Sequence, residues 1–215
     1  MKKVIIALAA MGLSSAARAG PSWTYIDAGY SAGSNSEESN TTPDEEVIGI
    51  KGVDGYDLTG SFGFAGIWHI NGTYGQISVD PKGSSDTDID YYRIGAGVHP
   101  AITDSTDFVA EIGYTGWEVD VDNGPEPDAI DLTLGVRSMV TDQFELNALL
   151  ATQIASTDGA VEADNNDDAL FFAPSLGGQY FFTDNISVNV SYKWNDVQSG
   201  LTSRNSDTAR FGVRW

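Results

Sequence analysis

Two runs of alternating residues in the segment YDLTGSFGFAGIWHINGTY (residues 56–74) decide the fold class of this chain. Every second residue is apolar or glycine from Tyr56 to Phe64, and again from Trp68 to Tyr74, on either side of a three-residue connection. A period of two residues is typical of a β-strand with one apolar face, whereas a helix repeats every 3.6 residues. The segment therefore predicts two antiparallel strands joined by a tight turn at 65–67.

The same alternation recurs along the chain and predicts ten strands, with eight as the alternative because boundaries read from sequence are uncertain by about two to four residues. The predicted strands cover residues 25–30, 56–64, 68–74, 91–98, 108–114, 130–137, 144–151, 172–182, 186–194 and 210–215. Pro174 lies inside the eighth of them. Since proline cannot donate a ladder hydrogen bond, we expect a bulge there.

The connections between the predicted strands alternate in length. The short ones are 65–67, 100–105, 141–143 and 183–185, and the long polar ones are roughly 33–53, 79–88, 118–128, 155–168 and 195–207. Short turns at one end and long loops at the other are typical of a transmembrane β-barrel whose short turns are periplasmic. An even number of strands then places both chain ends on the periplasmic side.

Aromatic residues of the apolar face are sorted to the two ends of the strands, with aliphatic residues between them. Beside the short connections lie Phe64, Trp68, Phe108, Phe144, Phe182 and Trp215. Beside the long connections lie Tyr30, Tyr56, Tyr74, Tyr92, Tyr114, Tyr192 and Trp194. Amphipathic rings prefer the head-group level, so two girdles around an aliphatic band indicate a bilayer. The core of a soluble β-sandwich, the alternative fold, has no reason to sort them.

The opposite face of the same strands carries charges of both signs. Its ionisable residues are Asp27, Asp57, Arg93, Glu111, Asp131, Arg137, Glu145, Lys193, Arg210 and Arg214. Enclosed charges must be paired or hydrated, and five acidic against five basic side chains permit pairing. An open sheet edge in lipid would leave backbone groups unsatisfied, so the sheet must close. The sequence thus predicts an all-β, antiparallel up-and-down barrel with these side chains as a charge network in its lumen.

The first nineteen residues have the pattern of an export signal. Lys2 and Lys3 precede an apolar stretch, and Ala17-Arg18-Ala19 fits the small-x-small cleavage rule. The apolar stretch is shorter than the roughly 20 residues that a spanning helix requires. We expect residues 1–19 to be a cleaved signal peptide and residues 20–215 to be one barrel domain in the outer membrane of a Gram-negative bacterium.

Composition excludes some classes of partner. The chain has 31 acidic and 11 basic residues, a formal net charge of −20, and no cysteine. An acidic protein repels the phosphate backbone, which argues against nucleic acid binding. Because the chain has no cysteine, it cannot form the disulfide bonds that stabilise many exported proteins.

The terminal segment RFGVRW (210–215), with Phe211, Val213 and Trp215 on one face, resembles the last strand of outer-membrane proteins. The layout is similar to small porin-like and OmpA-like barrels and most resembles outer-membrane β-barrel proteins of xanthomonads, through residues 25–30, 55–64 and 92–98. The resemblance implies that Phe211, Val213 and Trp215 form the signal read by the barrel-assembly machinery. It also implies contact with outer-membrane lipid and lipopolysaccharide, and we expect a monomer.

Residues suited to catalysis are few. The two histidines, His69 and His99, follow or precede short turns, and we expect a hydrogen-bonded lumen residue and a turn cap. The sequence has no nucleophile elbow and no His-Glu metal helix. The outer-rim His and Asp cluster of omptin-type proteases has no counterpart. We therefore expect no catalytic residue, no cofactor and no enzymatic activity.

Dense acidic runs mark the long connections. They are Glu37-Glu38, Asp44 to Glu46, residues 120–124 and residues 164–168. Carboxylate oxygens suit Ca²⁺, but the Asp-x-Asp-x-Gly string at 120–124 departs from an EF-hand loop. We expect a solvated acidic surface. The alternative is that divalent ions bridge these loops to lipopolysaccharide phosphates.

Two functions are compatible with these features. The first is a non-enzymatic surface barrel of the cell envelope that displays acidic extracellular loops. The second is a narrow porin-like channel, since ten strands give a lumen between the filled eight-stranded and the open sixteen-stranded barrels. Inward Tyr91 and Trp117 favour at most a narrow path. An outer-membrane hydrolase is a weaker third candidate.

Overall fold

The computed structural model describes residues 21–36, 50–81, 86–119, 128–156, 169–199 and 202–215, and these form strands and short turns. The strands are β1 (Tyr25–Ser36), β2 (Ile50–Phe64), β3 (Trp68–Pro81), β4 (Thr87–Val98), β5 (Ala101–Thr103), β6 (Thr106–Val119), β7 (Asp128–Thr141), β8 (Phe144–Ser156), β9 (Ala169–Phe181), β10 (Ser187–Ser199) and β11 (Thr202–Arg214). No helix within these ranges is long and apolar enough to cross a membrane. The predicted signal peptide and the four acidic runs lie outside the described residues.

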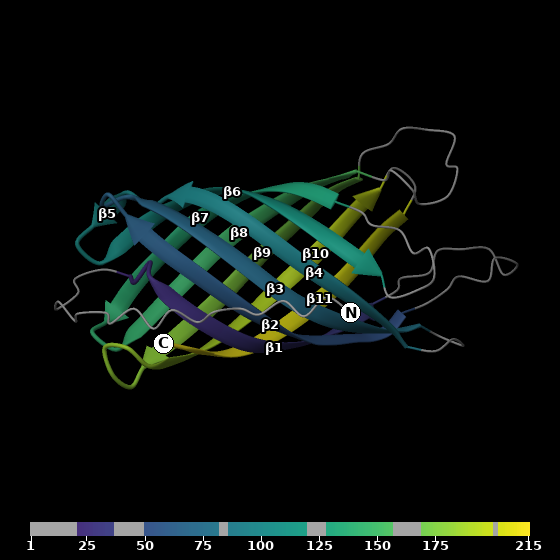
Figure 1. Cartoon of the computed structure of the whole chain (residues 1–215), viewed down its shortest axis with the longest axis horizontal. Coiled ribbons are helices and arrows are strands. Elements are labelled where there is room, and N and C mark those ends of the chain that lie inside the picture. The colour runs from purple at the N-terminus through teal and green to yellow at the C-terminus, as the bar shows by residue number, and fades with distance from the viewer. Residues whose placement is uncertain (1–20, 37–49, 82–85, 120–127, 157–168, 200–201) are drawn as a thin grey trace, which may run out of the picture.

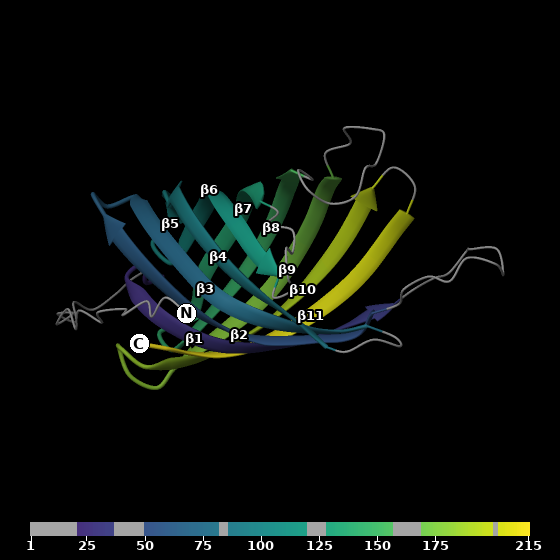
Figure 2. The same cartoon turned by 45° about the vertical axis from the view of Figure 1, so that its right-hand side comes forward.

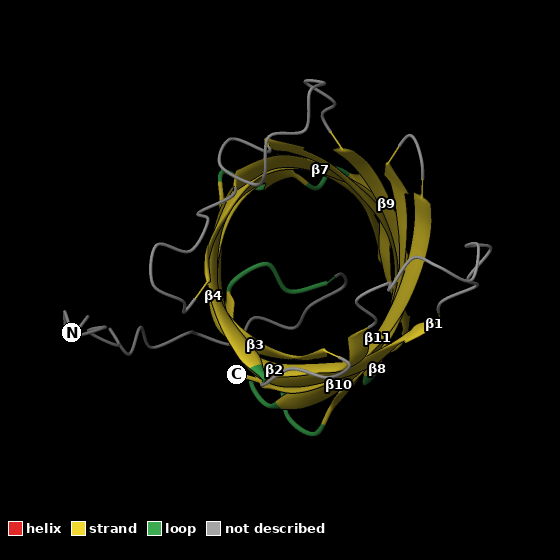
Figure 3. Cartoon of the chain, turned by 90° about the vertical axis from the view of Figure 1, so that its right-hand side faces the viewer, coloured by secondary structure: helices red, strands yellow, loops and turns green. Residues whose placement is uncertain are grey.

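Ten of the strands close into an antiparallel barrel. The hydrogen-bonded order is β4-β3-β2-β1-β11-β10-β9-β8-β7-β6-β5, and β4 also pairs with β6, which completes the ring. Figure 3 shows this ring along its axis, and Figures 1 and 2 show the tilt of its strands. The three-residue β5 pairs only with β6, inside the β4–β6 connection. The prediction of a ten-stranded up-and-down barrel is therefore confirmed.

The seam of the barrel joins the first and last strands. The Ile26 amide donates to the Trp215 carbonyl at 2.7 Å, and the Trp215 amide donates to the Ile26 carbonyl at 2.9 Å. The C-terminus lies at the end that carries the short connections 65–67, 99–105, 142–143 and 182–186 (Figure 1), which we call the turn end. The opposite end is called the loop end.

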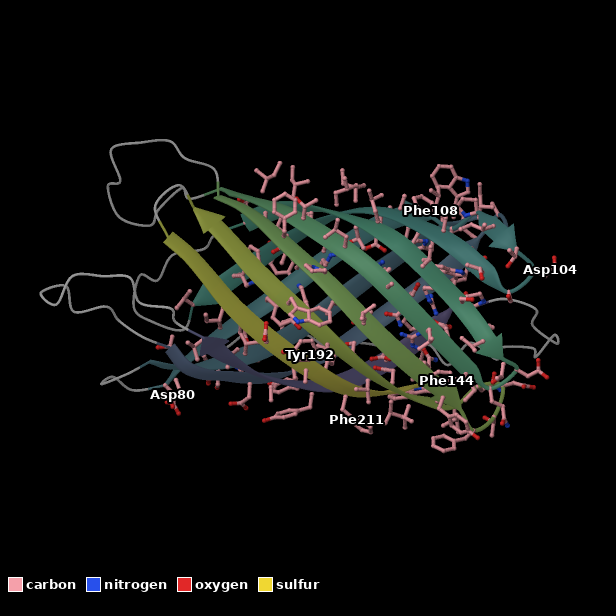
Figure 4. The ribbon with its side chains drawn as sticks, turned by 180° about the vertical axis from the view of Figure 1, so that it is seen from behind. Asp80, Asp104, Phe108, Phe144, Tyr192 and Phe211 are labelled. Carbon is pink, nitrogen blue, oxygen red and sulfur yellow. The ribbon has the colours of Figure 1, made fainter. Side chains whose placement is uncertain are left out.

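Side chains are distributed in the reverse of a water-soluble domain. The large hydrophobic residues of β1 to β11 are exposed on the outside, and the described residues include only three buried hydrophobics, Val109, Ala129 and Ala173. Most of the buried side chains are polar or charged. Figure 4 shows Phe108 and Phe144 toward the turn end marked by Asp104, and Tyr192 nearer the loop end marked by Asp80. Lipid is the environment that suits an apolar exterior of this kind.

The strands extend further toward the loop end than predicted. The expected loop at 195–207 is wrong, because β10 continues to Ser199 and β11 begins at Thr202, with Asn195 opposite Ser206. The predicted loop 33–53 is likewise shortened by β1 and β2. Apolar alternation ends where the side chains leave the hydrocarbon, whereas the backbone ladder continues into the polar region. Hydrophobic pattern alone therefore places strand ends too early.

Pro174 forms no bulge. Residues of β9 and β10 pair from Ser187–Phe181 to Lys193–Ser175 and resume at Asp196–Phe172 in the same register. On the other side, Leu150 of β8 stays opposite Pro174. The missing proline N–H interrupts the β9–β10 ladder without inserting a residue, so the predicted bulge is wrong and the ladder only has a gap.

Candidate functional site

The lumen holds the largest set of buried charges, and part of it is a cluster around Asp27 on β1. The Asp27 carboxylate accepts hydrogen bonds from Arg210, Arg214 and the amide of Asn189. Arg210 also donates to Asp57 through Nε at 2.8 Å and through Nη2 at 2.6 Å. Two carboxylates and two guanidinium groups on β1, β2 and β11 therefore neutralise one another, which meets the requirement for burying charge.

A second cluster surrounds Arg93 of β4. Its guanidinium donates to both oxygens of Asp131, pairs with Glu111, and reaches the Asn71 amide oxygen at 2.8 Å. The Glu111 carboxylate also contacts His69 Nε2 at 2.8 Å and accepts from the Asn71 amide at 2.6 Å. Arg93 and Asp131 lie on β4 and β7, with only β6 between them, so the cluster follows the curved wall.

The third cluster is a single ion pair between the neighbouring strands β7 and β8. Arg137 donates to Glu145 through Nε at 2.8 Å and Nη2 at 3.0 Å, which is a two-pronged contact. Both side chains are buried. Planar guanidinium and carboxylate groups match in this geometry, and such pairs are the stronger kind.

In two of the clusters the arginine side chains are more exposed to the lumen than the aspartates that neutralise them. The side chains of Arg93 and Arg210 are 20% and 21% exposed, whereas those of Asp131 and Asp27 are 3% and 2% exposed. A cavity of about 310 Å³ in the lumen is lined by Arg93, Arg137, Arg210 and Arg214 together with Glu111 and Glu145. Its surface is therefore richer in guanidinium groups than in carboxylates.

Inward-facing glycines make room for these guanidinium groups. A Cβ at Gly29 would overlap the Arg210 guanidinium, and one at Gly113 would overlap that of Arg93. Outward-facing Gly60 has no atom within 4 Å of a built Cβ. We expect Gly29→Ala to destabilise the barrel by about 1–3 kcal/mol through overpacking. The urea midpoint of refolded protein measures this, and Gly60→Ala is the control; equal shifts for the two variants would contradict the packing.

Residues 21–24, which we call the plug segment, lie inside the barrel at the turn end. Figure 3 shows this non-strand segment within the ring of strands. The Trp23 indole nitrogen donates to Asp107 at 2.7 Å, and the Arg137 guanidinium lies 4.3 Å from the Trp23 ring centre. The segment is tied to β2 by the Ser61 hydroxyl, which donates to the Trp23 carbonyl at 2.8 Å. Trp23 therefore reaches from its main-chain attachment on β2 to side chains of β6 and β7.

Both histidines contact Trp23. The rings of His69 and His99 stack on the indole with centres 4.6 Å and 4.2 Å away, and His99 Nδ1 lies 3.8 Å from Asp107. Burial, together with the neighbouring His69, lowers the pKa of His99. His69 is the hydrogen-bonded lumen residue that its position suggested. His99, expected to cap a turn, packs against the plug segment.

The structure brings nine of the ten predicted lumen charges into ion pairs, and Lys193 is the exception. Lys193 faces inward and half-buried but has no ion pair among the described residues. Sequence reasoning missed Trp23, Asp107, Asn71 and Asn189. Phe211, Val213 and Trp215 all point outward, as predicted for the terminal strand.

Within the described ranges, no group of three or more His, Cys, Asp or Glu side chains is arranged to hold a metal ion. Calcium on the predicted acidic runs stays a prediction, because those runs are not described.

Comparisons with known proteins agree with this geometry. A model of the outer membrane protein β-barrel domain matches residues 5–215. The chain is similar to an outer-membrane channel of Pseudomonas putida F1, with 10% identity, a TM-score of 0.55, and 90% of this chain and 95% of that chain covered.

Two further structures have lower TM-scores. A NanC porin has 13% identity and a TM-score of 0.49, with 86% of this chain and 98% of that chain covered. Ail, the attachment invasion locus protein of Yersinia pestis, has 16% identity and a TM-score of 0.38, with 89% and 97% covered. No curated protein matches the chain. At these identities the likeness shows the fold alone.

Proposed function

The chain belongs to the family of outer membrane protein β-barrel domains, and we propose that it is a closed, non-enzymatic barrel of the bacterial cell envelope whose acidic loop end faces the cell exterior. Trp23 carries this proposal. Its side chain projects into the lumen and is held by Asp107, Arg137 and two stacked imidazoles, so it obstructs the turn end. Such a barrel acts through the surface that it displays.

The outer wall at the loop end supports a role in surface contact. Tyrosine hydroxyls of the loop-end girdle donate to carboxylates on the neighbouring strand, as in Tyr30–Asp54 at 3.0 Å and Tyr192–Asp207 at 2.7 Å. The same contact joins Tyr114 to Asp128 at 2.9 Å. These carboxylates lie where strands leave the aromatic girdle, at the level of lipid head groups. We propose that they and the acidic loops form the contact surface toward external partners, and that divalent ions bridge them to lipopolysaccharide phosphates.

The contacts of the two histidines favour a non-enzymatic role. His69 is engaged with Glu111 and His99 is packed on Trp23, both at the turn end. Neither of them forms a hydrogen bond with a described serine or threonine side chain that could act as a nucleophile.

Planar-bilayer recording tests the closed state. We expect refolded wild-type protein to give no steady current steps, because the plug segment obstructs the turn end of the lumen. A lipid vesicle containing the protein should likewise retain a small entrapped dye. Reproducible, ion-selective steps from the wild-type barrel would contradict a closed scaffold.

A narrow channel is the second candidate, and the lumen cavity of about 310 Å³ favours it. The cavity borders Trp23 and is lined mainly by polar and charged side chains that can hydrate a solute. A channel of this kind requires the plug segment to move.

A further inference from the structure

We infer that the plug segment is displaceable and that the lumen behind it is an anion-preferring path, so that the barrel is a closed channel with its own plug. This goes beyond the proposed scaffold, which requires only that the wild-type lumen be closed. The inference joins two observations. One is how the plug segment is held, and the other is the charge of the cavity that it covers.

The plug segment is attached by side-chain contacts and not by a strand ladder. Residues 21–24 precede β1 and belong to no strand. Apart from the Trp23 contacts, one further tie is the hydrogen bond from the Gly63 amide to the Thr24 hydroxyl at 3.1 Å. Each of the ten strands of the ring is held by backbone pairing with two neighbours. The plug segment can therefore leave the lumen while the barrel stays closed as a ring.

Trp23 occupies the space that an open path would need. Its contacts Asp107 and Arg137 lie on β6 and β7, four and five places from β1 around the ten-stranded ring. Its other contacts, His69 and His99, lie on β3 and in the turn after β4. The indole thus occupies the part of the lumen between β2, β3, β6 and β7 at the turn end. Removing it deletes none of the ion pairs, because Trp23 contacts Arg137 and His69 only through its ring face and the pairs join residues of the strands.

The cavity behind the plug segment has room for a hydrated small ion. A volume of about 310 Å³ corresponds to about ten water molecules at about 30 Å³ each. Thr59, Thr73, Asn147 and Ser175 line it between the charged groups. These hydroxyl and amide groups can replace water around a passing solute.

Charge at the cavity surface favours anions. Four arginines and two glutamates line it, while Asp27, Asp57 and Asp131 lie behind their arginines against the wall. Displacement of Trp23 would also uncover the face of Arg137. Because the arginines are already paired, the path suits weak passage of small carboxylates, phosphates or chloride more than tight binding.

Single-channel recording of three tryptophan variants tests the inference. We expect Trp23→Ala to lose closure and give stable current steps where the wild type gives none. Trp23→Phe keeps the stacking but loses the hydrogen bond to Asp107, so its steps should be rarer than those of Trp23→Ala. Trp68→Ala, which removes an outward tryptophan at the same end, should stay silent. In a potassium chloride gradient, the reversal potential of Trp23→Ala should shift toward the chloride equilibrium potential.

Heat-modifiable gel mobility first establishes that each variant is folded, and a variant lacking residues 21–24 replaces Trp23→Ala if that protein does not fold. If folded Trp23→Ala, or the folded variant without residues 21–24, gives no current steps, the inference is wrong and the proposal of a closed scaffold still stands. A folded variant that conducts cations overturns the anion preference. Current from the wild type and from Trp68→Ala, equal to that of Trp23→Ala, contradicts the closed scaffold and the plug together.

Discussion

Replacing Ile112 by arginine is expected to destabilise the barrel by about 2–4 kcal/mol, as for a basic side chain on the lipid face at the bilayer midplane. Ile112 lies in the middle of β6 with its side chain 59% exposed on the outer wall. In a water-soluble protein, a surface substitution of this kind would stay within about 0.5 kcal/mol. Urea unfolding of the protein refolded in lipid vesicles measures the difference.

Ile102→Arg is the matched control. Ile102 is 58% exposed, almost the same fraction as Ile112, but lies in β5 at the turn end, outside the ring of spanning strands. Near the membrane interface the expected cost is about 0–1 kcal/mol. Equal costs for the two variants would contradict the assignment of the outer wall to lipid.

Asp27→Ala is expected to lower the free energy of unfolding by about 3 kcal/mol, the lower part of the range for breaking a buried ion pair. Asp27 accepts hydrogen bonds from Arg210, Arg214 and Asn189, so its loss leaves cationic groups short of partners inside the lumen. We expect the cost at the lower end of this range because Arg210 keeps its ion pair with Asp57.

Asp54→Ala is the control for this substitution. Asp54 is an outward, exposed carboxylate that accepts a hydrogen bond from Tyr30, and its loss should cost about 1 kcal/mol or less. Denaturant midpoints of the two variants, measured in the same detergent, make the comparison. If Asp54→Ala lowered the free energy of unfolding as much as Asp27→Ala, the buried cluster would contribute no more to stability than an exposed carboxylate.

The alternation of the sequence was sufficient to predict the barrel and the inward face of the ten predicted lumen charges. A strand side chain has only two directions, so Tyr56 to Phe64 already determines which face of β2 meets lipid. The resemblance of the terminal segment to small outer-membrane barrels is confirmed by the family match over residues 5–215. Cleavage of residues 1–19, recognition by the assembly machinery and a monomeric state stay predictions.

Pairing within the lumen could not be predicted in the same way. Arg93 reaches Asp131 two places around the ring, and this depends on strand register and curvature, which alternation does not specify. Lys193 lies on the predicted face but forms no salt bridge with a described residue. Trp23 precedes the first strand and so belongs to no periodic pattern. Its one sequence signal is a large aromatic residue just before β1.

The amphiphile requirement of folding tests most directly the claim that the outer wall faces lipid and the lumen encloses the charges. Residues 20–215, purified from denaturant, are diluted into buffer with or without detergent micelles, and circular dichroism and unheated gel mobility are compared. We predict β-sheet and a heat-modifiable band only with micelles, because water cannot solvate an exterior of isoleucine, leucine and aromatic side chains. A folded, soluble monomer in plain buffer would contradict this account.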